Sequence, residues 1–247
     1  MESSLYDLLK DYIPDDHSRQ VTLEYYLEHL LKEDHNINLV MDLGCGAGHS
    51  LDYFRCKKPG IRWVGLDIEQ SPEVESRTRT DGEFCTYDGI RMPFVDNHFD
   101  LVYCKQVLEH VRYPINLLKE VHRVLRPGGY FVGSTSQLEP YHSYSLWNYT
   151  PYGFCCLMED AGLQVVEIRP GIDAFTLIIR RGLGEPKFFS RWWAQESPLN
   201  LAISLSGKAM RKCTSWINLV KLLFCGQFCF RVRKSNTTSF DSECRSR

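Results

Sequence analysis

Three glycines stand at alternating positions, Gly44, Gly46 and Gly48, directly after a short apolar run that contains Asp42. Glycine adopts positive φ freely and lets a ligand approach its backbone amide, so this spacing predicts a tight turn with exposed N–H groups. A helix that follows such a turn points its positive end at whatever the turn holds. These residues therefore indicate a site for a nucleotide-type ligand.

Two well-known glycine motifs do not fit this stretch. The dinucleotide fingerprint G-x-G-x-x-G needs a glycine where His49 stands. A P-loop needs a Gly-Lys-Ser/Thr ending, which the sequence lacks here. A nicotinamide-dependent oxidoreductase therefore remains only as a less favoured alternative.

A second acid stands near the end of the next apolar run, Arg62–Ile68. In a doubly wound sheet the ligand lies outside the carboxyl ends of the strands, where an acid can accept both hydroxyls of a ribose. Asp67 lies roughly twenty residues beyond the glycines, which is the separation that one strand-helix-strand step imposes. We expect Asp67 to hold the ribose, with Glu69 as the alternative and Ile68 packed on the adenine face.

The elements that position these residues alternate between strand and helix. The pattern predicts one α/β domain with a doubly wound (Rossmann-like), seven-stranded and mostly parallel sheet, N-terminal helices, and a helical insertion before the last strand. The last strand is expected to be antiparallel. The predicted strands are Leu39–Leu43, Arg62–Ile68, Phe84–Asp88, Phe99–Cys104, Tyr130–Ser134, Leu163–Ile168 and Gln227–Arg233.

Five motifs in a fixed order identify a family. They read D-L-G-C-G-A-G, then D-x-x-x-x-P-F, F-D-L-V, V-L-E-H-V and finally E-V-H-R-V-L-R-P-G-G-Y-F-V. From about Val40 to Gly133 the chain resembles the class I S-adenosylmethionine-dependent methyltransferases, specifically the type 11 group that acts on small molecules. The resemblance implies that the protein is an enzyme and that S-adenosylmethionine is its cofactor.

The same resemblance implies roles for residues along the strand ends. Asp88 would accept a hydrogen bond from the adenine amino group, which is a pure donor. The backbone at Gly89 or Ile90 would meet the adenine ring. Asp42, the glycines of the turn and Lys105, at the end of the fourth strand, complete the expected cofactor site.

The loop at 136–152 follows the fifth strand and carries four tyrosines, a tryptophan and a histidine. Aromatic faces can shape an acceptor pocket and favour a sulfonium charge. Most of the catalysis comes from alignment and desolvation, since the cofactor carries the reactive group. If the acceptor needs a general base, His142 is the candidate and Glu139 competes with it. His110 is expected to be structural.

The acceptor class is narrowed by a missing motif. Methyltransferases that act on amino groups of nucleobases or glutamine place N-P-P-Y or D-P-P-Y where Tyr103-Cys104-Lys105-Gln106 stands. We therefore expect a small-molecule or lipid-linked acceptor methylated on oxygen, such as a sugar or polysaccharide precursor, a quinone or another secondary metabolite. A non-catalytic S-adenosylmethionine-binding protein of the same fold is the alternative.

Charge is distributed unevenly along the 247 residues, whose formal net charge is −2. Residues 180–247 carry 13 Lys+Arg against 4 Asp+Glu, and residues 1–179 carry 16 against 27. The acidic part would repel nucleic acid, so no nucleic-acid partner is expected. The basic helices with tryptophans suit peripheral contact with an anionic membrane. The alternative is a helical cap whose apolar face is internal.

The sequence also leads to expectations about the cellular compartment and the domain boundaries. The ten cysteines are scattered and no leader or membrane span is evident, so we expect reduced thiols, no metal site and a cytoplasmic protein, with membrane contact at most peripheral. The expected divisions are a helical lid at 1–37, the cofactor-binding core at 38–180, the insertion plus last strand at 181–234, and a disordered tail at 235–247. In the lid, His17, Arg19 and Tyr25 could contact ligand or could only pack on the sheet edge.

Overall fold

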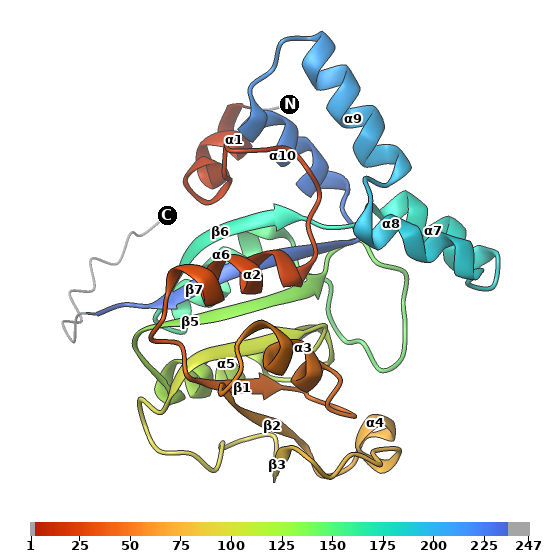
Figure 1. The fold of residues 1–247 in the computed structure, drawn as a ribbon. Coiled ribbons are helices and arrows are strands. Elements are labelled where there is room, and N and C mark those ends of the chain that lie inside the picture. Colours follow the sequence, from red (N-terminus) through yellow and green to blue (C-terminus); the bar gives the residue numbers. More distant parts are fainter. Residues whose placement is uncertain (1–2, 237–247) are drawn as a thin grey trace.

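A computed structural model describes residues 3–236, with side chains from residue 5 onward. Its seven strands form one sheet in the order β3-β2-β1-β4-β5-β7-β6 (Figure 1). All pairings are parallel except those of β7, which runs antiparallel between β5 and β6. This confirms the predicted fold. The strand bounds are β1 Leu39–Leu43, β2 Arg62–Ile68, β3 Glu83–Tyr87, β4 Phe99–Lys105, β5 Leu125–Ser136, β6 Leu163–Pro170 and β7 Gln227–Lys234.

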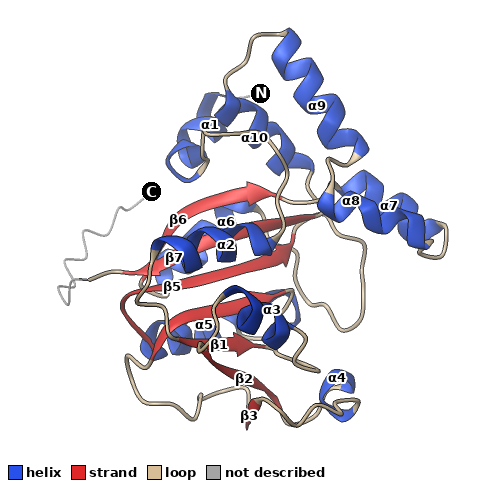
Figure 2. Cartoon of the chain, viewed as in Figure 1, coloured by secondary structure: helices blue, strands red, loops and turns tan. Residues whose placement is uncertain are grey.

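Helices cover both faces of the sheet (Figure 2). Helices α2 (Leu23–Glu33) and α3 (Ser50–Lys57) cover one face, while α5 (Pro114–Val124) and α6 (Pro151–Asp160) cover the other. Successive strand residues point to opposite faces, so Val40 packs with α2 and α3 whereas its neighbour Met41 packs with α5 and α6. The two buried clusters explain why the central strands are apolar on both sides.

The helix after the glycine turn begins at Ser50. Gly48 has φ of +78°, which interrupts the helix there. A short helix, α4 (Pro72–Glu75), follows β2, and a 3-10 turn, Leu108–His110, follows β4. The predicted fifth strand is extended at both ends, because it pairs with β4 on one side and β7 on the other.

The expected N-terminal helices are present, but a long segment without helix separates them. Helix α1 (Ser3–Leu9) continues as a 3-10 turn, Lys10–Tyr12, and the chain then runs without helix until α2 begins at Leu23. The intervening residues are held by side chains from elsewhere in the fold. Gln20, for example, donates to the Trp192 carbonyl at 2.6 Å and accepts from the Ser197 amide at 2.8 Å.

The insertion between β6 and β7 is helical, as predicted, but it is broken into pieces. These are α7 (Ala174–Gly182), a 3-10 turn (Lys187–Ser190), α8 (Arg191–Ala194), α9 (Pro198–Ala209) and α10 (Thr214–Phe224). Helix α10 carries Lys221, which is fully buried and pairs with Glu196 at 2.8 Å while donating to the Ser18 carbonyl. The insertion and the N-terminal segment are thus packed against each other.

Helices α7 and α8 lie beyond the carboxyl ends of the parallel strands, whereas α9, α10 and α1 lie beside the β6 edge (Figure 1). No helix within residues 3–236 is long and apolar enough to cross a bilayer. The nine cysteines in the described part are free thiols. Most of the predicted disordered tail, residues 237–247, lies outside the described residues.

Candidate functional site

The predicted glycine turn is present between β1 and α3. Gly44, Gly46 and Gly48 all have positive φ, at +72°, +48° and +78°. The Gly44 amide donates to the Leu66 carbonyl at 2.8 Å, and a Cβ on Gly44 would lie 2.4 Å from Cγ2 of Val107. Only glycine fits this conformation and this close approach.

Asp67 ties the glycine turn to the end of the neighbouring strand β2. Its Oδ2 accepts from the Gly46 amide at 2.7 Å and its Oδ1 accepts from the Ile68 amide at 2.8 Å. The carboxylate is half-buried, and the Ile68 side chain beside it is 44% exposed. An acceptor group and an open apolar face therefore lie next to each other at this strand end.

Asp88 directly follows β3, the strand next to β2 in the sheet, as Asp67 lies near the end of β2. Its Oδ1 accepts from the amides of Ile90 at 2.9 Å and Arg91 at 3.0 Å. These backbone hydrogen bonds hold the pKa of Asp88 below its usual range, so the carboxylate stays ionised at neutral pH. Gly89 has φ of +78°, and no atom lies within 4 Å of a Cβ placed on it.

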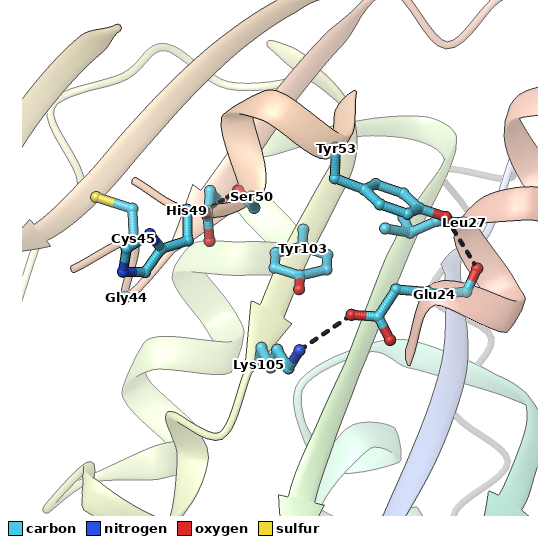
Figure 3. Close-up of a pocket in the computed structure, with 10 residues that line it drawn as sticks. Glu24, Leu27, Gly44, Cys45, His49, Ser50, Tyr53, Tyr103 and Lys105 are labelled. Atoms are coloured by element: carbon cyan, nitrogen blue, oxygen red, sulfur yellow. Dashed lines mark hydrogen bonds and ion pairs between the residues drawn. The ribbon is translucent and has the colours of Figure 1, made fainter. Parts of the chain in front are cut away.

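A cavity of about 250 Å³ opens beside the glycine turn (Figure 3). Helix α2 covers it from one side: Glu24 pairs with Lys105 at 3.0 Å, and the Tyr53 hydroxyl donates to the Glu24 carbonyl at 3.3 Å. The cavity thus combines an acid, a cation and an aromatic hydroxyl at one end. Its lining residues are Glu24, Leu27, Asp42, Gly44, Cys45, His49, Ser50, Tyr53, Tyr103 and Lys105.

Asp42 is a buried acid in the wall of this cavity, with 4% of its surface exposed. Burial, with a further contribution from the Asp67 charge, raises its pKa to about 7. The Ser50 hydroxyl donates to it and partly offsets this effect. A cationic ligand group bound nearby would favour the ionised form, since opposite charges lower the pKa of an acid.

Several lining residues carry no local signal in the sequence. Glu24 lies in the first turn of α2 and Tyr53 within α3, where each reads as an ordinary surface position of a helix. Tyr103 is one of several apolar or aromatic residues in β4. The packing of α2 over the sheet and the ion pair of Glu24 with Lys105, at the end of β4, bring these side chains together.

The lid residues proposed as ligand contacts lie elsewhere. The Tyr25 ring packs edge-on against His17 and receives the Arg169 guanidinium on its face, 4.8 Å from the ring centroid. Arg169 belongs to the edge strand β6 and pairs with Asp16 at 2.8 Å. Neither these residues nor Arg19 lines the cavity, so the structure agrees with the alternative of packing at the sheet edge.

A second hollow, of about 580 Å³, lies between the loop after β5 and helix α7. It is mostly apolar, with Glu139, Asn148 and Arg181 as its polar members. The full lining is Leu138, Glu139, Pro140, Asn148, Ala174, Ile178, Arg181 and Gly182. The loop therefore does emerge at the carboxyl edge, as its position after the fifth strand predicts.

The loop also carries His142, the candidate base. Its Nδ1 lies 3.3 Å from the Pro140 carbonyl oxygen and 3.9 Å from Oε1 of Glu139. Its ring meets that of His110 edge-on, with centroids 5.4 Å apart. The two competing base candidates thus lie together, but only Glu139 lines the hollow.

Glu109 is a buried acid that the sequence pattern did not single out. Its carboxylate accepts from Thr135 at 3.0 Å and from Ser136 at 3.2 Å. The Ser136 hydroxyl oxygen also lies 2.7 Å from Oε2 of Glu139, so this group connects the buried acid to the hollow. Burial raises the pKa of Glu109 to about 7.

Comparison with known proteins finds similarity to methyltransferases in the central part of the chain. Residues 41–133 match the family described as methyltransferase domain. A cycloartenol-C-24-methyltransferase of Oryza sativa is 33% identical over 98 residues, which cover 37% of this chain and 28% of that protein. A human thiol S-methyltransferase is 31% identical over 138 residues, which cover 49% of this chain and 55% of that protein.

The structural likeness extends beyond the matched segment. A Haemonchus contortus phosphoethanolamine N-methyltransferase, solved in complex with S-adenosyl-L-methionine, superposes with a TM-score of 0.53 at 14% identity. The match covers 86% of this chain and 52% of that one. At this identity the likeness concerns the fold. The chain spans less than two thirds of the length of each of these proteins.

Proposed function

We propose that this chain, a class I S-adenosylmethionine-dependent methyltransferase by family, transfers the methyl group of that cofactor to an oxygen atom of a small-molecule or lipid-linked acceptor. The observation that carries the proposal is the arrangement of the glycine turn, Asp67 and Asp88 at the carboxyl ends of three neighbouring strands. The loop after β5 and the helical insertion support the class of acceptor.

The residues at the carboxyl edge fit the cofactor. The Gly44 and Gly46 turn would lie against it, Asp67 would accept from the ribose hydroxyls, and Ile68 would cover one adenine face. Asp88 and the backbone at Gly89 would meet the adenine edge. The cavity with Asp42 and Lys105 offers a carboxyl and an ammonium group for the amino acid end, which carries both charges.

When bound, the cofactor supplies an electrophilic methyl group on a sulfonium. The chain's own contribution is alignment and exclusion of water. The hollow beside α7 would hold the acceptor, with its apolar walls excluding water and Glu139 or His142 receiving the proton of an acceptor hydroxyl. Oxygen is favoured because Tyr103-Cys104-Lys105-Gln106 stands in place of the motif that holds the amino nitrogen of a nucleobase or glutamine acceptor.

A lipid-linked acceptor is supported by exposed side chains of the insertion, part of which borders the hollow. Helices α7 and α9 and the turn between them expose large apolar side chains: Phe175, Ile178, Ile179, Leu183, Phe188, Leu201, Leu205 and Met210. Exposed cations lie among them: Arg181, Lys187, Arg191, Lys208, Arg211 and Lys212. Apolar side chains with surrounding cations favour an anionic membrane surface, and Ile178 and Arg181 also line the hollow.

Methyl-labelled S-adenosylmethionine tests both parts of the proposal. We expect the full chain to transfer label to lipid-linked sugars in anionic vesicles, and less to the same lipids in neutral vesicles. Phe175→Ser combined with Leu205→Ser should lower vesicle binding and transfer by at least about fivefold, because two apolar anchors are lost. Val95→Ser, at an exposed apolar position in the loop after β3 and away from the insertion, is the control.

Three outcomes would contradict parts of the proposal. Equal binding to neutral and anionic vesicles would remove the electrostatic argument for the membrane. Transfer only to water-soluble acceptors would restrict the function to small molecules. Tight binding of S-adenosylmethionine without transfer to any acceptor in a panel of sugars, quinones and their lipid-linked forms would favour the non-catalytic alternative.

A further inference from the structure

Glu109, His110 and His142 form a compact set of ligating groups at the carboxyl edge of the sheet. The first two belong to the 3-10 turn after β4 and the third to the loop after β5. One ligand atom from each lies within 4.8 Å of the others. We propose that this set, the Glu-His-His cluster, binds a divalent transition-metal ion of the Zn²⁺ type.

The donor chemistry supports an ion of this kind. Imidazole nitrogens suit Zn²⁺ and its first-row neighbours, whereas Mg²⁺ and Ca²⁺ prefer oxygen donors alone. Two histidines and one carboxylate make a three-ligand set of the type that leaves a position open for another molecule. Whether the three ligands can bind an ion therefore depends on how neighbouring groups orient them.

Each ligand of the cluster is oriented by a second group. The His142 Nδ1 lies 3.3 Å from the Pro140 carbonyl oxygen, and the His110 ring interacts with the backbone of Tyr144. The Pro140 contact engages Nδ1 of His142, which leaves its Nε2 available to a metal. The Glu109 carboxylate is held by the hydroxyls of Thr135 and Ser136. Orienting contacts of this kind are characteristic of metal ligands.

The cluster lies beside the hollow that we assign to the acceptor. Glu139 lines that hollow and lies 3.9 Å from the His142 Nδ1, and Ser136 bridges Glu139 and Glu109. An ion there would lower the pKa of an acceptor hydroxyl. The hydroxyl proton would pass to Glu139, the oxygen would form a bond to the methyl carbon, and the carbon–sulfur bond electrons would return to sulfur.

The sequence offered no reason to expect a metal. Glu109 and His110 are adjacent in a motif shared with the family, and His142 lies in a separate loop. The pairing of β4 with β5, from Leu101 with Tyr130 to Lys105 with Ser134, brings the two segments to one edge. The role in acceptor activation rests on the proposed function, whereas metal binding does not.

The test is calorimetric titration of the chelator-treated full chain with Zn²⁺, alone and after addition of S-adenosylhomocysteine. Because exposed thiols also bind Zn²⁺, the experiment uses the Cys56→Ser, Cys213→Ser background. We expect one site, and an affinity at least about tenfold weaker in His142→Ala and in Glu109→Gln. His35→Ala, at an exposed histidine far along the chain from the cluster, should bind like its parent.

Cobalt(II) absorption provides a second readout, because its visible spectrum reports nitrogen ligands directly. Loss of the cobalt spectrum in His142→Ala, with thermal unfolding unchanged, supports the site even if Glu109→Gln fails to fold. Absence of binding in the parent, or equal affinity in His142→Ala and the parent, would overturn the proposal. Either result can occur while methyl transfer persists, so failure of the metal site is distinguishable from failure of the proposed function.

Discussion

Replacing Asp67 by alanine should weaken the affinity for S-adenosylhomocysteine by roughly 10- to 150-fold, which corresponds to about 1.5 to 3 kcal/mol for hydrogen bonds to a charged group. The carboxylate lies at the carboxyl end of β2 and is held by the Gly46 and Ile68 amides. It is thereby fixed in orientation before any ligand binds. Calorimetric titration of the parent and the variant measures the loss.

Glu69→Ala is the matched control for this prediction. Glu69 is an exposed acid two residues further along, and it was the alternative ribose ligand in the sequence. Asp67→Asn separates two effects, because an amide oxygen can still accept from Gly46 while the charge is lost. Unchanged affinity in a folded Asp67→Ala protein, or an equal loss in Glu69→Ala, would refute the assignment of Asp67 to the ribose.

The second large effect concerns Asp42 and pH. Its folded-state pKa is raised from 3.8 to about 7, so between these values the folded protein binds more protons than the unfolded chain. The free energy of unfolding therefore falls as pH rises through this window and levels off above pH 7. For a shift of this size the loss is on the order of 2 to 4 kcal/mol.

Asp42→Asn isolates this contribution. The amide oxygen can still accept from Ser50, but no buried charge forms as pH rises. Urea unfolding at pH 5 and pH 8 should therefore show the variant gaining stability relative to the parent at the higher pH. If the stability difference between the two proteins does not change with pH, the burial argument for Asp42 is wrong.

The core of the fold could be predicted because its elements carry strong local patterns. Strands β1 and β2 have the bounds that the apolar runs indicate, and the glycine turn lies between them. The bounds of the helices in the insertion were harder to predict from the sequence, because tertiary contacts define them. Gln20 and Lys221, for example, connect the N-terminal segment to Glu196 and fix where the helices of the insertion meet it.

The residues of the candidate site also fall into two groups: those that the sequence identifies and those that only the folded structure reveals. Asp67 and Asp88 could be found from their places at strand ends, where chain order alone fixes their position at the sheet edge. Glu24 and Tyr53 could not, because each reaches the cavity only through the packing of α2 against α3 and the strand ends. Glu109 was hidden for another reason: its neighbours Thr135 and Ser136 come from a strand that is distant in sequence.

The most direct test of the central claim is calorimetric titration of the purified chain with S-adenosylmethionine, S-adenosylhomocysteine and NADH in parallel. The glycine spacing, Asp67 and Asp88 predict micromolar binding of the first two and none of the third. Binding of NADH without binding of the other two would contradict the account and require the chain to be reinterpreted as an oxidoreductase.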